Sequence, residues 1–372
     1  MPEFEGYFRG RRVLVTGDSG FKGSWLCLWL AELGADVAGY SLPPPANRPS
    51  NFKISGIGDL IRHVDGDVRD LTSLIRLFHD HRPEVVFHLA AQPLVPASYE
   101  YPVETFTINV IGSVHLLEAV RQTGSATSVV MVTSDKSYRN KEWVWGYRET
   151  DELGGDDPYS ASKASAEIAI ASYRHGLERV WPLNIRPAIA SARAGNVIGG
   201  GDWSPDRLVP DLVRSVEKGE PVQLRKPSAT RPWQHVLEPL SGYLWLARKL
   251  ASGGEVYRSA WNFAPSAEAP LPVQDLAERF LKCWGPTSST LQLPDETEAD
   301  AKESTLLRLN SDKALHVLGW RNTWNADEMI AATADWYRTY SQQPEGDLKE
   351  LSHRQIELFV TQARERGLSW AL

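Results

Sequence analysis

Residues 12–34, RVLVTGDSGFKGSWLCLWLAELG, decide the fold of this chain. The opening apolar run, RVLVT, ends at a glycine and predicts a short buried strand. Residues 21–33 then place apolar side chains at helical spacing and stop at Gly34, a residue typical of helix C-termini. A strand, a glycine-rich loop and a helix in this order predict the first part of a nucleotide-binding βαβ unit.

The loop between this strand and this helix, GDSGFKG, spaces its glycines as G-x-x-G-x-x-G, a variant of the dinucleotide-binding fingerprint. Glycines permit a tight turn and a close approach of the backbone to a pyrophosphate, and the N-terminus of the following helix favours negative charge. We therefore predict that a dinucleotide cofactor binds at Gly17, Asp18, Ser19, Gly20, Phe21, Lys22 and Gly23.

The second predicted strand, residues 36–41, ends at Tyr40 and Ser41 without the acidic residue that commonly holds the ribose hydroxyls of NAD. Asp18, inside the loop, is a candidate substitute. Its charge would repel the 2′-phosphate of NADP, so we predict NAD as the cofactor. The alternative is that Asp18 is only a turn residue.

Strands and helices alternate through the rest of the first half. EVVFHLAA (84–91) is a continuous apolar run of the kind expected for a strand covered on both faces. The alternation predicts an α/β fold, a Rossmann-type doubly wound parallel sheet. Further strands are predicted to end near 65–68 and to cover 84–91, 128–134 and 180–186, and helices to cover 70–81, capped by Asp70, 103–122 and 159–176.

Two of these strand ends supply candidates for the adenine side of the cofactor. Asp67 and Val68 close the third strand, where the carboxylate would accept the exocyclic amine; a helix cap is the alternative role for Asp67. Leu89, Ala90 and Ala91 close the fourth strand with side chains that leave room for a flat cofactor, although small residues are equally common where a helix meets a sheet.

The alternation loosens after about residue 190, and residues 195–206 are a glycine-rich loop. The closing helix, 349–366, either seals an assembly or caps the second lobe. We predict a Rossmann domain over 1–190 with returning segments near 230–260, a smaller mixed α/β substrate-binding lobe over 191–342, and a helical extension over 343–372. The lobe is expected to hold helices at 207–218, 236–250, 271–283 and 324–341 and short strands near 222–224 and 259–263.

Composition excludes several classes of protein. The 372 residues are 42% hydrophobic and 23% charged, which excludes a disordered chain, and a net charge of −7 argues against nucleic-acid binding. Cys27 and Cys283 give neither a disulfide framework nor a metal site. We find no signal peptide and no apolar run of membrane-spanning length, so we expect a cytoplasmic protein without membrane contact.

Tryptophan is unusually frequent, with 14 residues. Trp25 and Trp29 lie four apart on the first helix and are expected to pack that helix on the sheet. Trp203 and Trp233 fall in loops that also carry candidate substrate residues. They are either walls of the pocket or packing residues.

Tyr159 and Lys163 are spaced four apart, which places a phenol and an ammonium on one face of a helix. The ammonium would lower the pKa of the phenol, because a nearby positive charge favours the phenolate. A phenolate beside a hydroxyl is a general base for removal of hydride from the adjacent carbon. Ser134, at the end of a buried strand, is placed to bond the reacting oxygen.

With these motifs the chain resembles the extended short-chain dehydrogenase/reductase family, in its nucleotide-sugar 4,6-dehydratase branch. Most of residues 12–250 share the resemblance, and two motifs, GNVIGGGDWSPDRLVPD and RPWQHVLEPLSGYLWLA, are specific to members acting on CDP-glucose. One departure is Asp18, where those members usually carry histidine. The other stretches are VTGDSGFKGSWLCLWL, FHLAAQPLV, TSDKSY, YSASK and, further on, SDKALHVLGW.

The resemblance implies that CDP-glucose loses water in three steps with NAD as cofactor: oxidation at C4, elimination across C5 and C6, and return of hydride to C6. Tyr159 would take the proton of the 4-hydroxyl, Lys163 would hold the nicotinamide ribose, and Ser134 would orient O4. Asp135 would protonate the leaving hydroxyl. Lys136 would take the C5 proton if neutral or stabilise the enolate if protonated. The alternative is that Asp135 and Lys136 form only an ion pair in a loop, without a catalytic role.

The substrate is expected along the carboxyl edge of the sheet. By resemblance, Asn196 meets the diphosphate or the sugar, and the family assembles as a homodimer or homotetramer through helices 103–122 and 159–176. Guanidinium groups suit phosphate oxygens. The candidates for substrate binding are Gln92, Asn196, Arg207, Arg231 and His235, and no metal is expected.

Two other functions stay open at this point. A sibling nucleotide-sugar epimerase or reductase, with NAD or NADP, would share the glycine loop and the Tyr159–Lys163 pair but would not need Asp135 and Lys136. A dinucleotide-binding regulator without catalysis would keep the loop, but such a protein has no need of Ser134, Tyr159 and Lys163 together.

Overall fold

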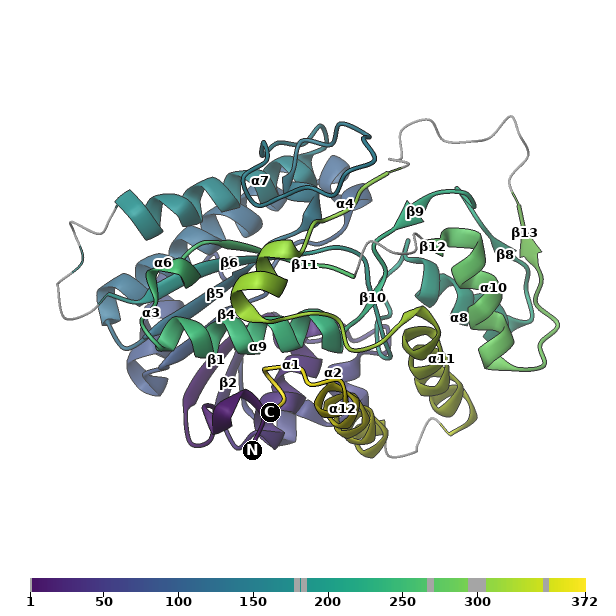
Figure 1. The fold of residues 1–372 in the computed structure, drawn as a ribbon, viewed down its shortest axis with the longest axis horizontal. Coiled ribbons are helices and arrows are strands. Elements are labelled where there is room, and N and C mark those ends of the chain that lie inside the picture. Colours follow the sequence, from purple (N-terminus) through teal and green to yellow (C-terminus); the bar gives the residue numbers. More distant parts are fainter. Residues whose placement is uncertain (1, 177–180, 182–185, 266–270, 294–305, 344–347) are drawn as a thin grey trace.

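The computed structural model describes residues 2–176, 181, 186–265, 271–293, 306–343 and 348–372. Seven parallel strands form one sheet in the order β11-β6-β5-β4-β1-β2-β3. The predicted Rossmann-type fold is thereby confirmed (Figure 1). The strands are β1 Arg12–Thr16, β2 Asp36–Ser41, β3 Arg62–Asp65, β4 Val85–His88, β5 Ser128–Val132, β6 Ala188–Ala194 and β11 Ala260–Phe263.

Helices cover both faces of the sheet because side chains alternate along each strand. In β1, Val13 and Val15 join one apolar cluster with α1 and α9, whereas Leu14 joins the other with α3 and α6. One layer contains α1 Phe21–Glu32, α9 Leu237–Ala251 and α12 Leu348–Glu365. The other contains α3 Leu71–His81, α4 Val95–Glu100, α5 Pro102–Phe106, the π-helical η3 Thr107–Ile111, α6 Gly112–Thr123, α7 Pro158–Ala171 and η5 Ser172–Gly176.

The second lobe lies beside the carboxyl ends of the strands (Figure 1). Its helices are α8 Leu208–Lys218, α10 Val273–Trp284 and α11 Ala326–Gln342. Its short strands are β7 Val197–Ile198, β8 Val222–Gln223, β9 Thr230–Arg231, β10 Gln234–His235, β12 Leu271–Pro272 and β13 Leu291–Gln292. Short turns are η1 Glu3–Gly6, α2 Asn51–Ile54, η2 Ile57–Asp59, η4 Asp135–Ser137, η7 Glu255–Tyr257 and η8 Ala314–Leu318.

One expectation about strands needs correction, one falls mostly outside the described residues, and the division into domains is not tested. The strand predicted over 180–186 lies mostly outside the described residues, and the strand that pairs with β5 is β6, AIASARA, which is too polar and small to read as an apolar run. The strand near 259–263 is not part of the second lobe, because β11 pairs with β6 in the main sheet. The predicted domain boundary at residue 190 falls inside β6, and the division into domains stays a prediction.

One helical stretch, Pro102–Thr123, is long and apolar enough to span a membrane by length and composition. The stretch meets this measure by its average hydropathy, because polar residues such as Glu104, Asn109 and Ser113 interrupt its apolar side chains. In the structure 44% of its most apolar window is buried, and it packs against α3 and α7. Its apolar side chains therefore contribute to the packing of the helical layer on the sheet.

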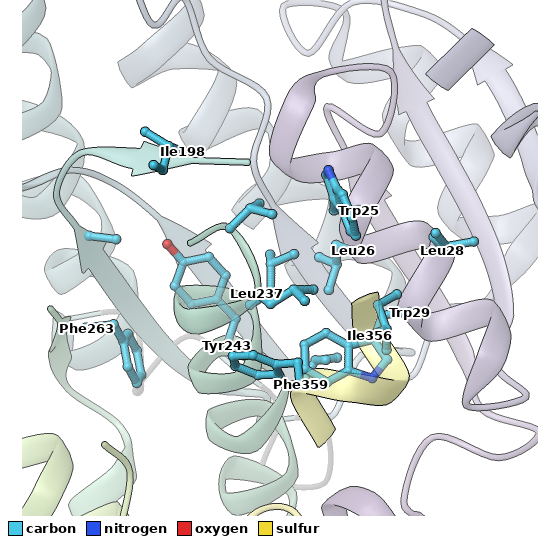
Figure 2. Packing of buried hydrophobic residues seen from close by; sticks show 14 of the residues in the cluster. Trp25, Leu26, Leu28, Trp29, Ile198, Leu237, Tyr243, Phe263, Ile356 and Phe359 are labelled. Atoms are coloured by element: carbon cyan, nitrogen blue, oxygen red, sulfur yellow. The ribbon is translucent and has the colours of Figure 1, made fainter. Parts of the chain in front are cut away.

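The last helix packs against the first one. Trp29 of α1 meets Phe359 of α12 (Figure 2), with ring centroids 5.9 Å apart. Phe4 stacks on Trp370 at 5.3 Å. Trp25 instead donates to the backbone oxygen of Gly200 at 2.8 Å. Both tryptophans belong to the buried cluster that also contains the β1 valines. In addition to this packing, they fasten α1 to later parts of the chain.

Candidate active site

A cavity of about 720 Å³ lies at the carboxyl ends of the central strands, between the sheet and the second lobe. This is where ligands bind in open parallel sheets. The structure brings most predicted site residues to its wall: Gly17, Ser19, Gly20, Phe21, Lys22, Gly23, Asp67, Val68, Leu89, Ala90, Ala91, Ser134, Asp135, Lys136, Tyr159, Lys163, Asn196, Arg207 and Arg231.

The glycine loop is shaped so that side chains could not replace its first and last glycines. Gly17 has a φ of +78°, and a Cβ there would come within 2.7 Å of the backbone nitrogen of Ala90. A Cβ on Gly23 would lie 2.0 Å from the carbonyl oxygen of Gly17. The loop therefore presents bare backbone at the N-terminus of α1, a cradle that fits the pyrophosphate of a dinucleotide.

Asp18 does not reach the cavity. Its side chain is fully buried, and its Oδ2 lies 2.6 Å from Nδ1 of His63 on β3. A Cβ on Gly39 would lie 2.0 Å from that oxygen, so the glycine of β2 leaves the space that the carboxylate fills. Asp18 is therefore not placed to contact the ribose directly, because its side chain is turned away from the cavity. The effect of its charge on a 2′-phosphate stays a prediction.

Gln92 and His235 also fail to line the cavity. The Gln92 side-chain amide donates to Oγ1 of Thr105 at 2.9 Å, which ties the segment after β4 to α5. His235 is buried between Trp25 and Trp324, with ring centroids 6.1 and 4.7 Å away, and burial lowers its pKa to about 3. A neutral, enclosed imidazole fills the core, so neither residue is placed to bind substrate.

The two candidate pocket tryptophans, Trp203 and Trp233, do line the cavity. Trp203 also packs against Tyr337 and Tyr340 of α11, with ring centroids 5.3 and 5.0 Å away. The two roles left open by the sequence are therefore combined in Trp203, since it is both a wall and a packing residue.

The reaction centre is assembled where β5 ends. Ser134 Oγ donates to Oδ1 of Asp135 at 2.9 Å, and both residues are buried beside the N-terminal turn of α7. The other oxygen of Asp135, Oδ2, is buried and has no hydrogen-bond partner among the described residues. A carboxylate held at one oxygen is suited to exchange a proton at the other.

Tyr159 is oriented by its backbone and by its neighbours. Its N–H donates to Oγ of the buried Ser98 at 3.1 Å. Burial raises the pKa of Tyr159 to about 12, while a hydrogen bond from Ser134 opposes that shift; Asp135 adds to it, and Arg207 opposes it. The expected lowering of this pKa by Lys163 is therefore not found, because the cost of burying a phenolate dominates.

Two lysines extend into this centre. Burial lowers the pKa of Lys163 to about 8, against the charge of Glu167 one helical turn further on. Burial, together with the charge of Arg207, also lowers the pKa of Lys22 to about 8, against the charge of Asp135. The sequence analysis named Lys22 only as part of the glycine loop. In the structure its ammonium also interacts with the charges of Arg207 and Asp135 at the reaction centre.

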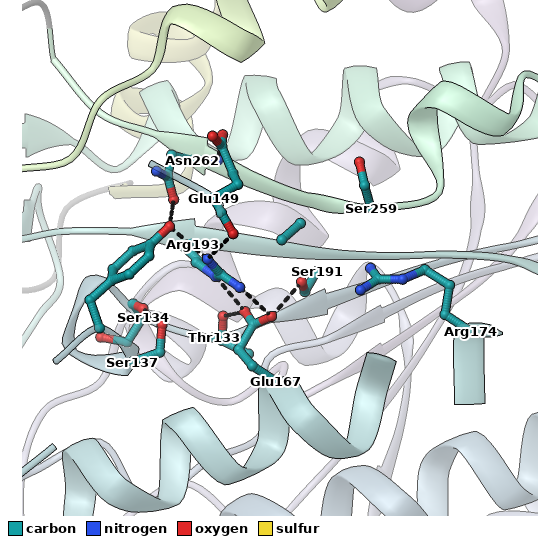
Figure 3. A network of polar contacts seen from close by, with 12 residues as sticks. Thr133, Ser134, Ser137, Glu149, Glu167, Arg174, Ser191, Arg193, Ser259 and Asn262 are labelled. Atoms are coloured by element: carbon teal, nitrogen blue, oxygen red, sulfur yellow. Dashed lines mark hydrogen bonds and ion pairs between the residues drawn. The ribbon is translucent and has the colours of Figure 1, made fainter. Parts of the chain in front are cut away.

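A buried network behind the cavity was missed by sequence reasoning (Figure 3). Glu167 of α7 pairs with Arg193 of β6, with Nη2 to Oε2 at 2.8 Å and side chains 3% and 2% exposed. The same carboxylate accepts from Oγ of Ser191 at 2.7 Å and from Oγ1 of Thr133. Arg193 also donates to the hydroxyl of Tyr138 at 2.6 Å. The spacing of Glu167, four after Lys163, was the available signal.

Asp202, which the sequence analysis did not name, also lines the cavity beside the predicted residue Arg207. Arg207 is held by Asp202, with Nη1 to Oδ2 at 2.7 Å, so the guanidinium is fixed at the cavity wall. Further lining residues include Ser41, Leu42, Arg48, Asn51, Asp206, Gln223, Leu224, Arg225 and Lys226.

A glycine loop, a Tyr-x-x-x-Lys pair and a serine that meet at the carboxyl edge of a parallel sheet define a dehydrogenase-type site. The GDP-mannose 4,6 dehydratase family matches residues 14–333, and the chain belongs to this family. The resemblance inferred from the sequence motifs is thereby confirmed.

Among curated relatives, the CDP-glucose 4,6-dehydratase of Salmonella typhimurium is 46% identical over 337 residues, covering 90% of this chain and 92% of the relative. The UDP-glucose 4-epimerase of Erwinia amylovora is 27% identical and covers 90% and 99%.

Solved structures share the fold. The dTDP-glucose 4,6-dehydratase of Bacillus anthracis, in complex with NAD, aligns with a TM-score of 0.71 at 20% identity, covering 90% of this chain and 98% of that one. The UDP-glucose 4-epimerase of Stenotrophomonas maltophila, with bound NAD, aligns with a TM-score of 0.75 at 23% identity and covers 89% and 99%.

Replacing Glu167 by Gln should destabilise the protein by about 3 kcal/mol or more, because Arg193 would keep a buried charge without its partner. The matched control is Glu118→Gln on α6, whose pair with Arg121 is partly exposed and should contribute less than about 1 kcal/mol. Urea unfolding of the two variants measures the difference; equal midpoints would contradict the role given to the buried pair.

The same pair predicts a dependence on pH. Burial raises the pKa of Glu167, but the charge and hydrogen bonds of Arg193 outweigh burial and hold the pKa below its usual value. The contribution of the pair to stability is therefore complete above the unfolded pKa and is lost as the pH falls through the folded one. The Glu167→Gln variant should lack this component of acid sensitivity.

Proposed function

We propose that this protein converts CDP-D-glucose to CDP-4-dehydro-6-deoxy-D-glucose by loss of water, with NAD as cofactor. The observation that carries the proposal is the meeting of Ser134, Asp135, Lys136, Tyr159 and Lys163 on one cavity that also contains the glycine loop. An identity of 46% to a CDP-glucose 4,6-dehydratase over 90% of the chain supports the choice of nucleotide and sugar.

The cavity fits the cofactor that this reaction needs. The cradle of Gly17, Gly20 and Gly23 offers backbone to a pyrophosphate, and Lys163 lies on the wall beside Tyr159. When bound, NAD supplies the hydride acceptor for C4 and the hydride donor for C6. The protein contributes orientation, charge and proton transfer.

Each side chain at the reaction centre then has a proton to hold or move. Tyr159 takes the proton of the 4-hydroxyl at its phenol oxygen, and Ser134 holds O4 in place. Asp135 gives a proton to the departing 6-hydroxyl from its otherwise unpartnered Oδ2. The C5 proton, made acidic by the 4-ketone, goes to the neutral amine of Lys136, which lies in the same turn as Asp135 on the cavity wall. Lys136 gives this proton back to C5 when hydride returns to C6.

The nucleotide end of the substrate is assigned to the second lobe. Arg207, fixed by Asp202, and Arg231 offer guanidinium groups to the diphosphate, and Asn196 lies between them and the reaction centre in the chain. Trp203 and Trp233 form apolar walls on the same side. The acidic protein thus meets an anionic substrate through a local group of cations.

Incubation with CDP-, dTDP-, GDP- and UDP-glucose should give loss of one water from CDP-glucose at the highest rate, because the chain is 46% identical to a CDP-glucose 4,6-dehydratase. Mass spectrometry of the product makes the measurement. The Tyr159→Phe variant should be slower by about 10²-fold or more, since it cannot take the proton. A product of unchanged mass would indicate an epimerase, and cofactor binding without turnover would indicate a regulator.

Replacing Lys136 by Met should slow exchange of the C5 hydrogen with solvent deuterium by about 10²-fold or more, because the base is lost. Oxidation at C4 should continue, so that reduced cofactor accumulates in a single turnover and is seen by its absorbance. The control is Lys282→Met on the exposed side of α10, which should behave as wild type. If exchange at C5 survives in the Lys136 variant, Lys136 does not serve as the base.

We also propose a homodimer formed by α5, α6 and α7. These helices expose apolar side chains on the outside of the layer, with Val103 79% and Ile168 62% exposed, and Phe106 and Ile111 beside them in the chain. A second copy that presents the same face would cover both patches around a twofold axis. A higher assembly and the cytoplasmic location stay predictions.

The variant Val103→Asp with Ile168→Asp should halve the mass measured by light scattering, because the charges oppose burial of the patches. The control Leu358→Asp changes a side chain 51% exposed on α12 and should leave the mass unchanged. A wild-type protein that runs as a monomer would contradict the proposed dimer.

A further inference from the structure

Three buried polar atoms around Asp135 have no hydrogen-bond partner among the described residues. They are Oδ2 of Asp135 itself, the hydroxyl oxygen of Tyr243 on α9 and the side-chain oxygen Oε1 of Gln234 on β10. The three residues are 4%, 0% and 2% exposed, so bulk solvent does not reach these atoms. Because buried polar atoms in proteins are almost always hydrogen-bonded, each of them calls for a partner.

Tyr243 and Asp135 approach the same segment of chain, the one that joins β6 to β7. Helix α9 packs on β5 and β6, and burial together with the charge of Asp135 raises the pKa of Tyr243. A Cβ on Gly195 would lie 3.3 Å from Oδ2 of Asp135, so this oxygen is next to the end of β6. Figure 2 shows the Tyr243 hydroxyl directed away from α9, toward the side on which Ile198 of β7 lies.

Gln234 connects the surroundings of these two residues. Its backbone N–H donates at 3.1 Å to the carbonyl oxygen of Asn196, the residue after Gly195. Its side-chain Nε2 donates to the carbonyl oxygen of Phe263 at 2.9 Å, and the Phe263 ring meets the ring of Tyr243 with centroids 5.7 Å apart. Gln234 is thus fixed at both ends between the segment beside Asp135 and the neighbour of Tyr243, and its Oε1 remains as an acceptor.

Packing explains the ring of Tyr243 but not its hydroxyl. The ring belongs to the apolar cluster of the layer that contains α1 and α9, where phenylalanine would fill the same space. A buried hydroxyl without a partner destabilises a protein, so a tyrosine here needs a compensating contact. One water molecule supplies that contact, because it can accept from Tyr243 and donate to both Gln234 and Asp135.

We propose that Tyr243, Gln234 and Asp135 hold one buried water molecule, which makes Tyr243 a positioning residue for the acid of the elimination step. The inference rests on the proposed function, since that function gives Asp135 its role as the acid. A carboxylate oxygen has two lone pairs, so Oδ2 can accept from the buried water on one and carry the transferable proton on the other. The buried water thereby holds this proton on the side of the cavity.

The same water stabilises the charge that the acid acquires. When the proton passes from Oδ2 to the 6-oxygen, the C6–O bond breaks with its electron pair on that oxygen, and Asp135 is left as a carboxylate. The C5 proton goes to Lys136 as in the proposed function, so no proton-transfer step is added. A hydrogen bond to the charged form favours that form, so the buried water and Tyr243 behind it lower the barrier to elimination.

A crystal structure and urea unfolding test the buried water without any substrate. The wild-type protein should show density at about 2.7–3.0 Å from the hydroxyl of Tyr243 and from Oδ2 of Asp135. The Tyr243→Phe variant should lose this density, and its unfolding midpoint should fall, because Gln234 and Asp135 then keep acceptors without a donor. A dry site gives the opposite result, since removal of an unpaired hydroxyl leaves the midpoint unchanged or raises it.

Single-turnover kinetics with CDP-glucose test the role of Tyr243 in the reaction. In the Tyr243→Phe variant reduced cofactor should form at the wild-type rate, because the groups that act at C4 are unchanged, and elimination should slow about tenfold. Gln234→Met removes a second partner of the same water and should slow the same step. The control Tyr147→Phe removes a buried hydroxyl that donates to Asn140 at 3.0 Å, away from the cavity wall. It should lower the unfolding midpoint and change neither rate.

Three results would overturn the inference. They are a wild-type structure without density at this site, density that persists in the Tyr243→Phe variant, and equal effects of that variant on oxidation and on elimination. Turnover of CDP-glucose by the wild-type protein, measured separately, tests the proposed function. A protein that holds the buried water but leaves CDP-glucose unchanged would refute the proposed function and keep the water site.

Discussion

The carboxylate of Glu167 holds together the elements on which the reaction centre depends. It lies on the helix that carries Tyr159 and Lys163, and it binds Thr133, the neighbour of Ser134, and Arg193 of the next strand. Taking two charges out of water costs several kcal/mol, so such a pair is tolerated only when its hydrogen bonds are complete. Here the donors are supplied by Thr133, Ser191 and Arg193 (Figure 3). Because Glu167 lies on α7 and Thr133 follows β5, these hydrogen bonds hold α7 at a fixed distance from the end of β5.

Sequence reasoning reached the features that depend on local pattern. The glycine loop, the amphipathic helices and the Tyr159–Lys163 pair are set by spacing along the chain, so they could be predicted. Strand β6 was missed because AIASARA contains small and polar side chains, whose burial follows from the helices above and below. The Glu167–Arg193 pair joins residues far apart in the sequence. The only signal for it in the sequence was the position of Glu167, four residues after Lys163.

Errors at the site came from the direction of side chains. Three predicted residues lie next to segments of the cavity wall, but their side chains contact other parts of the protein. Asp18 contacts His63, Gln92 contacts Thr105, and His235 packs between Trp25 and Trp324. Which way a side chain turns depends on space left by distant residues, such as the missing Cβ of Gly39. A motif therefore identifies the wall of a pocket better than it identifies the groups that face the ligand.

The contact of α1 with α12 has a consequence for folding during synthesis. The face of α1 that includes Trp29 is covered by Phe359 and Trp370, residues that lie much later in the chain. The glycine-loop unit is synthesised before α12, so its aromatic surface stays uncovered until the segment that carries α12 has left the ribosome. During synthesis, the N-terminal half must therefore either wait in a partly packed state or be shielded by a chaperone, and a premature stop would leave that surface exposed.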